Sequence, residues 1–478
     1  MARGLRRREA TMAVACVAHD RGVAPRQLVG AAGAKKAWRE SEDSILVPVD
    51  FTPLRCNPLG GYGQFYAGSL YRLGLTHTPN DRPGVDELTP EGRSIADALG
   101  VEIGRARYVT GGYQSTAVLP KPILIDLGSR ICLCRAPNEE AADREPLREL
   151  FLALGPHATP DGRMRREALL LCLDVIARAT ELGKPIPLAR ADASIANDAV
   201  YYGQIHGPRG PRRYKAPPAL QTCASRWRLL ALHRQFSHAM EHVLAVALAA
   251  GSASPTAVLD QVDWRNVAGR FSARVAGTAA ERLAQWIEGK PGCLPLSAEE
   301  SQAFDRGTGL RSKACEETLV RALRAPTCPG DAVALAVELL VVLHARFQHA
   351  RKTSEAWREI AEWVGDGLWF EPVAARMEAS MVAGEGARAL MTALAQSEVV
   401  PRLGSRLIGR GHSPTPSLRA RAHQSRYRPP WRDAKIQTCV SILRDLGLLT
   451  CADGMLGLTR DGVALRSGLI DGCRSERS

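Results

Sequence analysis

Apolar residues recur at helical spacing along most of this chain, so the pattern predicts a mainly α-helical protein. One helical pattern, interrupted near Gly22, covers residues 8–40, and another covers residues 140–186. Strands are scarce, and the best candidates outside two hairpins are residues 108–120 and 121–127. Further helices are expected near residues 223–250, 255–288, 298–324, 331–364 and 370–395.

Two segments, one near each end of the chain, follow the same order of elements. Each has a helix, a glycine that ends it, a polar hairpin, and a threonine that begins a second helix. A glycine after a helix supplies the positive φ needed at that position, and threonine is a favoured helix N-cap. The matched residues are Leu70, Leu73, Gly74, Leu75, Leu88, Thr89 and Gly92 in the first segment and Leu443, Leu446, Gly447, Leu448, Leu458, Thr459 and Gly462 in the second.

Both segments resemble the C-terminal part of winged-helix domains, such as those of the MarR and PadR families of bacterial transcription regulators. The resemblance covers about 40 residues at each end. It implies a helical core flanked by two winged-helix-like modules with small β-hairpin wings, and a surface that binds DNA or protein. The domains expected are 1–115 (N-terminal helices with the first module), 116–203 (helices with short strands), 204–218 (a basic linker), 219–405 (a central helical domain) and 406–478 (a basic arm with the second module).

The chain also carries an excess of positive charge. It has 63 lysines and arginines against 50 aspartates and glutamates, which gives a net charge of +13. Arginine accounts for most of the basic residues, and its planar guanidinium suits phosphate. Nucleic acid is therefore the first partner to expect. A basic protein from an arginine-rich proteome would show the same excess without such a partner.

Two clusters concentrate this charge and interleave it with aromatic residues. Arginine beside tyrosine or tryptophan suits phosphate contacts combined with base stacking. The alternative for each cluster is a solvated basic loop. The expected DNA-binding residues are Arg209, Arg212, Arg213 and Lys215 around Tyr214, and Arg419, Arg421, Arg426, Arg428, Arg432 and Lys435 around Tyr427 and Trp431.

A possible zinc motif, H-x-x-E-H, occurs at His238, Glu241 and His242. This spacing is the signature of the inverted metalloproteases. On a helical projection both histidines lie opposite the apolar face, so we expect them at the surface and without metal. The chain has neither a P-loop nor a G-x-S-x-G sequence. We therefore expect no catalytic residue and no cofactor, with a zinc hydrolase as the alternative.

The histidine motif overlaps a repeat. The octet "LHRQFSHA" at residues 232–239 recurs as "LHARFQHA" at residues 343–350, and the second copy does not continue into the glutamate and the last histidine. The shared residues therefore indicate a repeated helical unit. We expect Phe236 and Phe347 to be buried at equivalent places on two helices.

The cysteines give no sign of a disulfide framework or a zinc finger. There are 12 of them, and the closest pair, Cys132 and Cys134, lacks a second cysteine pair at zinc-finger spacing. Reduced, mostly buried thiols are expected. Because no apolar stretch is long enough for a signal peptide or a membrane span, a cytoplasmic location is expected.

These observations favour a non-catalytic, DNA-associated subunit of a bacterial multi-protein complex, by analogy one used in antiviral defence against foreign DNA. It is expected to bind double-stranded DNA mainly through phosphates. The second module is expected to make the main DNA contact, because the basic arm leads into helix 436–444. The first module is expected to pack on protein, since its wing is acidic. The wing residues concerned are Asp81, Asp86, Glu87 and Glu91 against Arg82. A protein-interaction scaffold, with both modules binding subunits, is the alternative.

Overall fold

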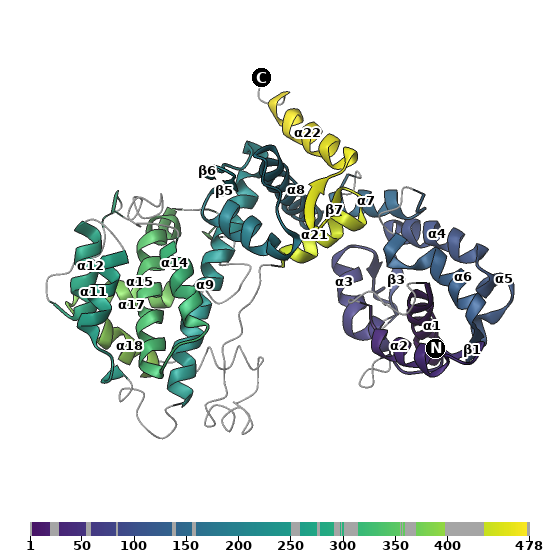
Figure 1. Cartoon of the computed structure of the whole chain (residues 1–478), viewed down its shortest axis with the longest axis horizontal. Helices are drawn as coiled ribbons and strands as arrows, with labels where there is room; N and C mark the ends of the chain where they lie inside the picture. The colour runs from purple at the N-terminus through teal and green to yellow at the C-terminus, as the bar shows by residue number, and fades with distance from the viewer. Residues whose placement is uncertain are drawn as a thin grey trace. The chain divides into compact units, whose positions relative to one another are not determined.

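The computed structural model describes residues 2–19, 28–53, 59–82, 85–135, 140–154, 159–249, 259–274, 278–290, 297, 299–300, 314–353, 355, 357–358, 370–396 and 435–475. Its contacts group into two compact units (Figure 1). Unit 1 comprises Met1–Ala191, Pro217–Leu220 and Lys435–Ser478, and unit 2 comprises Asp192–Ala216 and Gln221–Ala434. Unit 2 is therefore inserted into the chain of unit 1. The domains expected from the sequence are consecutive ranges and do not include such an insertion.

The structure is mainly helical with small antiparallel two-stranded sheets, as the sequence pattern predicts. The elements of unit 1 are α1 (Ala2–His19), α2 (Ala31–Glu40), β1 (Leu46–Pro48), η1 (Tyr62–Tyr66), α3 (Ala67–Arg72), β2 (Thr76–His77), β3 (Glu87–Leu88), α4 (Pro90–Arg105), α5 (Arg107–Thr110), η2 (Tyr113–Ser115), β4 (Val118–Pro120), α6 (Lys121–Ile131), η3 (Leu133–Arg135), α7 (Arg144–Leu152), α8 (Pro160–Glu181), η4 (Leu188–Arg190), η6 (Pro218–Leu220), α21 (Ile436–Asp445), β7 (Leu449–Ala452), β8 (Met455–Leu458) and α22 (Arg460–Ser475). The elements of unit 2 are η5 (Asp192–Tyr201), β5 (Gln204–Gly207), β6 (Gly210–Arg213), α9 (Gln221–Ala249), α11 (Trp264–Arg274), α12 (Thr278–Glu288), α14 (Ala314–Leu323), α15 (Pro329–Thr353), α17 (Phe370–Val382) and α18 (Ala387–Gln396).

Helices α1 and α6 pack along each other in the N-terminal part of unit 1. The expected strand at residues 121–127 is wrong, because this segment forms the first part of α6. Pro122 occupies the first turn of α6, where proline is tolerated, and Ile123, Leu124 and Leu127 are buried at helical spacing. The two helices approach so closely that a Cβ on Gly128 would lie 2.1 Å from the carbonyl oxygen of Ala15.

The two matched segments form two helix–hairpin–helix motifs with the same internal hydrogen bonds. We call them the N-terminal hairpin motif (α3, β2, β3, α4) and the C-terminal hairpin motif (α21, β7, β8, α22). In the first, the Thr89 N–H donates to the Leu75 carbonyl at 3.1 Å; in the second, the Thr459 N–H donates to the Leu448 carbonyl at 3.1 Å. Each threonine hydroxyl also accepts the N–H three residues later, at 3.1 Å. The repeat predicted from the sequence is thereby confirmed in its register.

Glycine is required at the start of the second helix of each motif. A Cβ on Gly92 would lie 2.0 Å from the Leu75 carbonyl oxygen, and one on Gly462 would lie 2.2 Å from the Leu448 carbonyl oxygen. The first turn of the helix therefore rests directly against the backbone that enters the hairpin. Gly74 and Gly447, which end the preceding helices, have φ of 74° and 67°, the left-handed region that favours glycine.

The C-terminal hairpin motif is completed by residues that precede the insertion. The Leu456 N–H donates to the Ile186 carbonyl at 2.9 Å, and the Leu188 N–H donates to the Gly454 carbonyl at 2.8 Å. Residues 186–188 thus pair with the start of β8 through a single antiparallel bridge, Pro187 with Met455. Helix α8 packs on α21 and α22, where Arg466 pairs with Asp174 at 3.0 Å. Segments that precede and follow unit 2 in the sequence therefore both contribute to this motif.

Unit 2 is a helical bundle in which α9 and α15 pack against each other and α14 contacts both. Phe236 on α9 and Phe347 on α15 have exposed fractions of 0% and 1%. The prediction that the repeated octet buries both rings is confirmed. Within the described residues, no helix is long and apolar enough to span a membrane.

Candidate nucleic-acid interface

The segment expected to be a basic linker, 204–218, is instead mostly a β-hairpin. Strands β5 and β6 pair antiparallel, with Ile205 opposite Arg212. Ile205 and Tyr214 are buried, and the Tyr214 N–H donates to the Gly203 carbonyl at 2.7 Å. The hairpin forms because these two apolar side chains anchor it while Gly210, with φ of 106°, allows the tight turn.

All four cations expected from the sequence are exposed on this hairpin. Arg209 lies at the turn, Arg212 and Arg213 lie on β6, and Lys215 follows it. Neighbouring strand residues point to opposite faces, so Arg212 and Arg213 place positive charge on both faces. None of the four forms an ion pair with another residue in the part of the chain that the structure describes. The expected stacking role of Tyr214 is wrong, because its ring is buried.

The second basic cluster is described only at its last residue. Lys435 is exposed at the start of α21 with φ of 61°, and the cluster's other members lie outside the described residues. Helix α21 buries Ile436, Val440 and Leu443. Its exposed residues include Thr438 and Asp445, so the helix itself supplies polar groups and little positive charge. The residues outside the described part are Arg419, Arg421, Arg426, Tyr427, Arg428, Trp431 and Arg432.

The hairpin of the N-terminal hairpin motif has an acidic surface. Its one arginine, Arg82, pairs with Glu87 at 2.8 Å and with Asp81 at 3.4 Å. Asp86 accepts hydrogen bonds from the hydroxyls of Thr78 and Tyr62, which lower the pKa of this carboxyl and keep it ionised. The neutralised arginine and the ionised carboxylates give this hairpin a surface unsuited to phosphate.

The expectation that His238 and His242 are at the surface is wrong. Their exposed fractions are 3% and 5%, and Glu241 is buried as well. Helix α9 is covered on more than one side, because it packs against α15, η5, α14 and α18. A central helix buries polar residues that an amphipathic surface helix would expose. Among the described residues, His238, Glu241 and His242 do not bring three ligand atoms together.

The buried histidines predict a loss of stability in acid. Their rings meet edge to face with centroids 4.7 Å apart, and burial lowers the pKa of His238 to about 3 and that of His242 to about 4. In the unfolded chain both titrate near about 6.5. The unfolded state therefore binds more protons below that pH, so stability is full above about pH 6.5 and falls as the pH decreases towards about 4. Each histidine contributes at most about 1.4 kcal/mol per pH unit in this window.

Urea unfolding at pH 7 and pH 5 measures this effect. His242→Gln is expected to shrink the difference in free energy of unfolding between the two pH values by about 1–2 kcal/mol. His77→Gln is the matched control, because His77 is exposed, and it should leave the difference as in the wild type. A His242→Gln protein with the wild-type difference would contradict the prediction.

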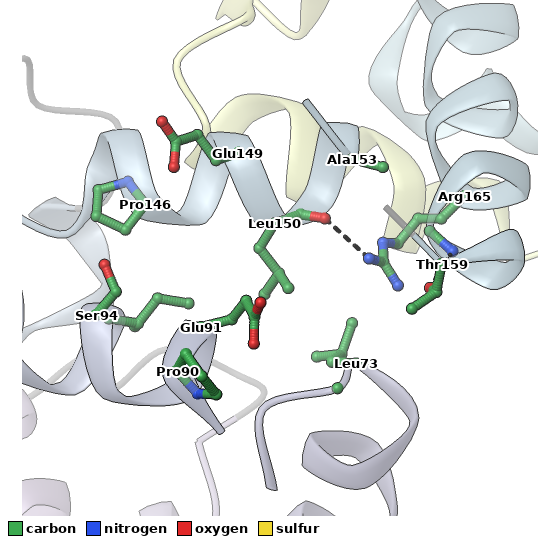
Figure 2. Close-up of a pocket in the computed structure, with 13 residues that line it drawn as sticks. Leu73, Pro90, Glu91, Ser94, Pro146, Glu149, Leu150, Ala153, Thr159 and Arg165 are labelled. Carbon is green, nitrogen blue, oxygen red and sulfur yellow. Dashed lines mark hydrogen bonds between the residues drawn. The ribbon is translucent and has the colours of Figure 1, made fainter. Parts of the chain in front are cut away.

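Unit 1 also contains a pocket of about 380 Å³, between the start of α4 and helices α7 and α8 (Figure 2). Glu91 and Glu149 line it, and the Arg165 guanidinium donates to the Leu150 carbonyl at 2.9 Å. Burial lowers the pKa of Arg165. The described lining offers hydrogen-bonding groups but pairs no nucleophile with a base, so it does not define an active site.

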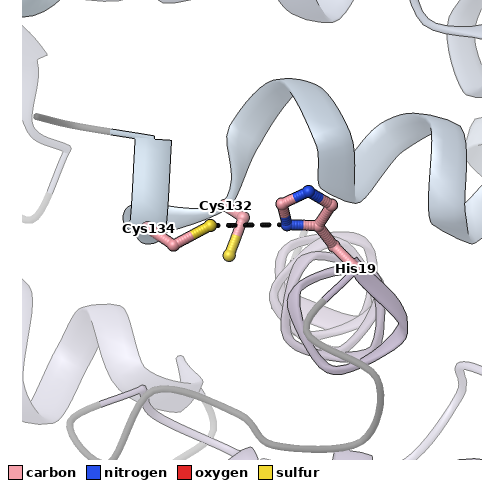
Figure 3. A group of neighbouring side chains, drawn as sticks. All are labelled: His19, Cys132 and Cys134. Carbon is pink, nitrogen blue, oxygen red and sulfur yellow. Dashed lines mark hydrogen bonds between the residues drawn. The ribbon is translucent and has the colours of Figure 1, made fainter. Parts of the chain in front are cut away.

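Comparison of the chain with protein-family models, with curated proteins and with solved structures found no match. A function must therefore be inferred from the geometry of the chain itself. Two surfaces differ in the sign of their charge: the β5–β6 hairpin presents Arg209, Arg212, Arg213 and Lys215, which have no ion-pair partner among the described residues, whereas the hairpin of the N-terminal hairpin motif is acidic. A third feature, a convergence of cysteine and histidine side chains, lies at the end of α1 (Figure 3).

Proposed function

We propose that this protein binds duplex DNA through its phosphates, as a non-catalytic subunit of a larger bacterial assembly. The observation that carries the proposal is the β5–β6 hairpin, which presents four exposed cations with no acidic partner among the described residues. A two-stranded ribbon of this kind fits the width of a DNA groove. The net charge of +13 adds long-range attraction to the duplex.

In this proposal the C-terminal hairpin motif is a winged helix and a second DNA contact. Its order of helix, hairpin and helix, with residues 186–188 paired alongside β8, supports the resemblance. The arginines of residues 419–432 directly precede α21 in the chain. Their phosphate contacts would position the polar face of α21 against the duplex, because backbone contacts orient a DNA-binding helix.

The N-terminal hairpin motif faces a protein subunit in the same proposal. Its hairpin is acidic, and large apolar side chains are exposed on and beside it. Phe65, Tyr71 and Val85 have exposed fractions of 50%, 63% and 46%. Aromatic residues are enriched in the cores of protein–protein interfaces, whereas carboxylates repel phosphate.

A salt titration of duplex binding tests the hairpin. Fluorescence anisotropy of a labelled duplex of arbitrary sequence should give an affinity that falls linearly with salt on logarithmic axes. The triple variant Arg209→Glu, Arg212→Glu, Arg213→Glu should bind at least about tenfold more weakly, and the slope should decrease by about 2–3 as three phosphate contacts disappear.

The matched control reverses Arg72, Arg82 and Arg93, which are also exposed but belong to the N-terminal hairpin motif. It changes the net charge by the same amount and should retain most of the binding. Equal losses in both variants would show that only the net charge matters. Salt-independent or undetectable binding by the wild type would refute the DNA proposal and favour the protein scaffold.

A further inference from the structure

Three potential metal ligands converge where α1 and α6 end (Figure 3), and a fourth lies beside them. The ligand atoms of His19, Cys132 and Cys134 all lie within 4.8 Å of one another, and His19 Nδ1 is 3.4 Å from the Cys134 sulfur. Cys16 is the fourth, because its thiol hydrogen-bonds the sulfur of Cys132. Cys16 and Cys132 are buried, whereas Cys134 is exposed.

Two local features of the chain bring these groups together. Cys16 and His19 are three residues apart on α1, so they project from the same face of that helix. Cys132 and Cys134 follow the last turn of α6 at C-x-C spacing. The glycine at position 128 lets the two helices touch just before the site: a Cβ there would lie 2.8 Å from the Cβ of His19.

The distances among His19 Nδ1 and the sulfurs of Cys132 and Cys134 can be compared with those of a tetrahedral zinc centre. Zn–S bonds of about 2.3 Å and Zn–N bonds of about 2.0–2.1 Å place two sulfurs about 3.8 Å apart, and a sulfur and a nitrogen about 3.6 Å apart. The 3.4 Å between His19 Nδ1 and the Cys134 sulfur is close to the second value. The Cys132 sulfur lies within 4.8 Å of both atoms, so movement of the side chains would bring the three to the separations of a zinc centre.

We propose that Cys16, His19, Cys132 and Cys134 form a structural zinc site that ties the end of α1 to the segment following α6. Three thiolates and one imidazole are a ligand set that zinc favours, and four protein ligands leave no open position for catalysis. Each thiol that is still protonated releases its proton to solvent on binding. The site is independent of the proposed DNA interface, because none of its ligands belongs to the β5–β6 hairpin.

Metal analysis of the full-length protein tests the proposal. Protein made in zinc-supplemented medium and purified without chelators should contain about one zinc per chain. Cys134→Ser alters the exposed ligand, the one least involved in packing, and should weaken zinc binding at least about tenfold. Cys328→Ser, a matched change of an exposed cysteine in unit 2, should leave the zinc content unchanged.

Cobalt substitution gives a readout on the folded wild-type protein. Co²⁺ in this site should show the absorption of a tetrahedral centre together with thiolate-to-metal charge transfer. That charge-transfer intensity should fall by about a third in Cys134→Ser, because one of three thiolates is lost. Absence of stoichiometric zinc, zinc retained in Cys134→Ser, or a disulfide among Cys16, Cys132 and Cys134 would overturn the proposal. Loss of zinc in His242→Gln, with zinc retained in Cys134→Ser, would place the metal on α9.

Discussion

Replacing Phe347 by alanine is expected to lower the free energy of unfolding of unit 2 by about 3–5 kcal/mol. The ring is fully buried and stacks on Tyr201 with centroids 5.6 Å apart. The guanidinium groups of Arg228 and Arg346 lie 5.4 and 5.7 Å from its centroid. Truncation therefore removes ring contacts, opens a cavity and removes the cation–π contacts of the two guanidinium groups.

Phe236→Ala is expected to cause a loss of similar size, because its ring is buried at the matching position of the repeated octet. Urea unfolding followed by tryptophan fluorescence measures both, since Trp286 is buried in the same core. Phe65→Ala is the matched control: this ring is half exposed, and its removal should change stability by about 0.5 kcal/mol or less. Losses below about 1 kcal/mol in the buried pair would contradict the packing described for α9 and α15.

Arg346→Met is expected to destabilise unit 2 by about 3–5 kcal/mol, because it leaves a buried carboxylate without its cation. Glu316 has no exposed surface, and Arg346 Nη1 lies 3.5 Å from its Oε2. The Tyr201 hydroxyl donates to the other oxygen at 2.8 Å. Burial, followed by the Glu316 charge, raises the pKa of Tyr201 well above its usual value, so this hydroxyl stays protonated and continues to donate.

A double-mutant cycle separates the pair from the packing of its members. Arg346→Met with Glu316→Gln removes both charges and should recover a large part of the loss, because a neutral amide has a much smaller desolvation penalty. Arg105→Met provides the control, since the Arg105 side chain is exposed and its pair with Glu102 at 2.9 Å should contribute about 1 kcal/mol or less. A single-variant loss no larger than this control would show that the Glu316 charge is stabilised by other groups.

The mainly helical class and the two hairpin motifs could be predicted from the sequence alone. Both follow from local rules. A glycine at positive φ ends a helix, a threonine caps the next helix, and a second glycine, which has no Cβ, leaves space for a backbone carbonyl oxygen. These interactions join residues close in the chain, so Thr89 and Thr459 could be assigned the same role without knowledge of their surroundings. The burial of Phe236 and Phe347 followed in the same way, because an apolar residue repeated in a helical pattern faces a core.

Features that depend on residues distant in the chain could not be predicted in this way. His238 and His242 are buried because other elements cover the second face of α9, which helical periodicity does not reveal. Residues 204–213 form a hairpin in which β5 packs against η5 and Ile205 and Tyr214 are buried, whereas the prolines, glycines and arginines of this segment locally resemble a linker. The convergence of Cys16 and His19 with Cys132 and Cys134 escaped a count of cysteine pairs, since one pair contains a histidine. Only the close contact at Gly128 brings the two pairs, more than a hundred residues apart in the chain, to one point.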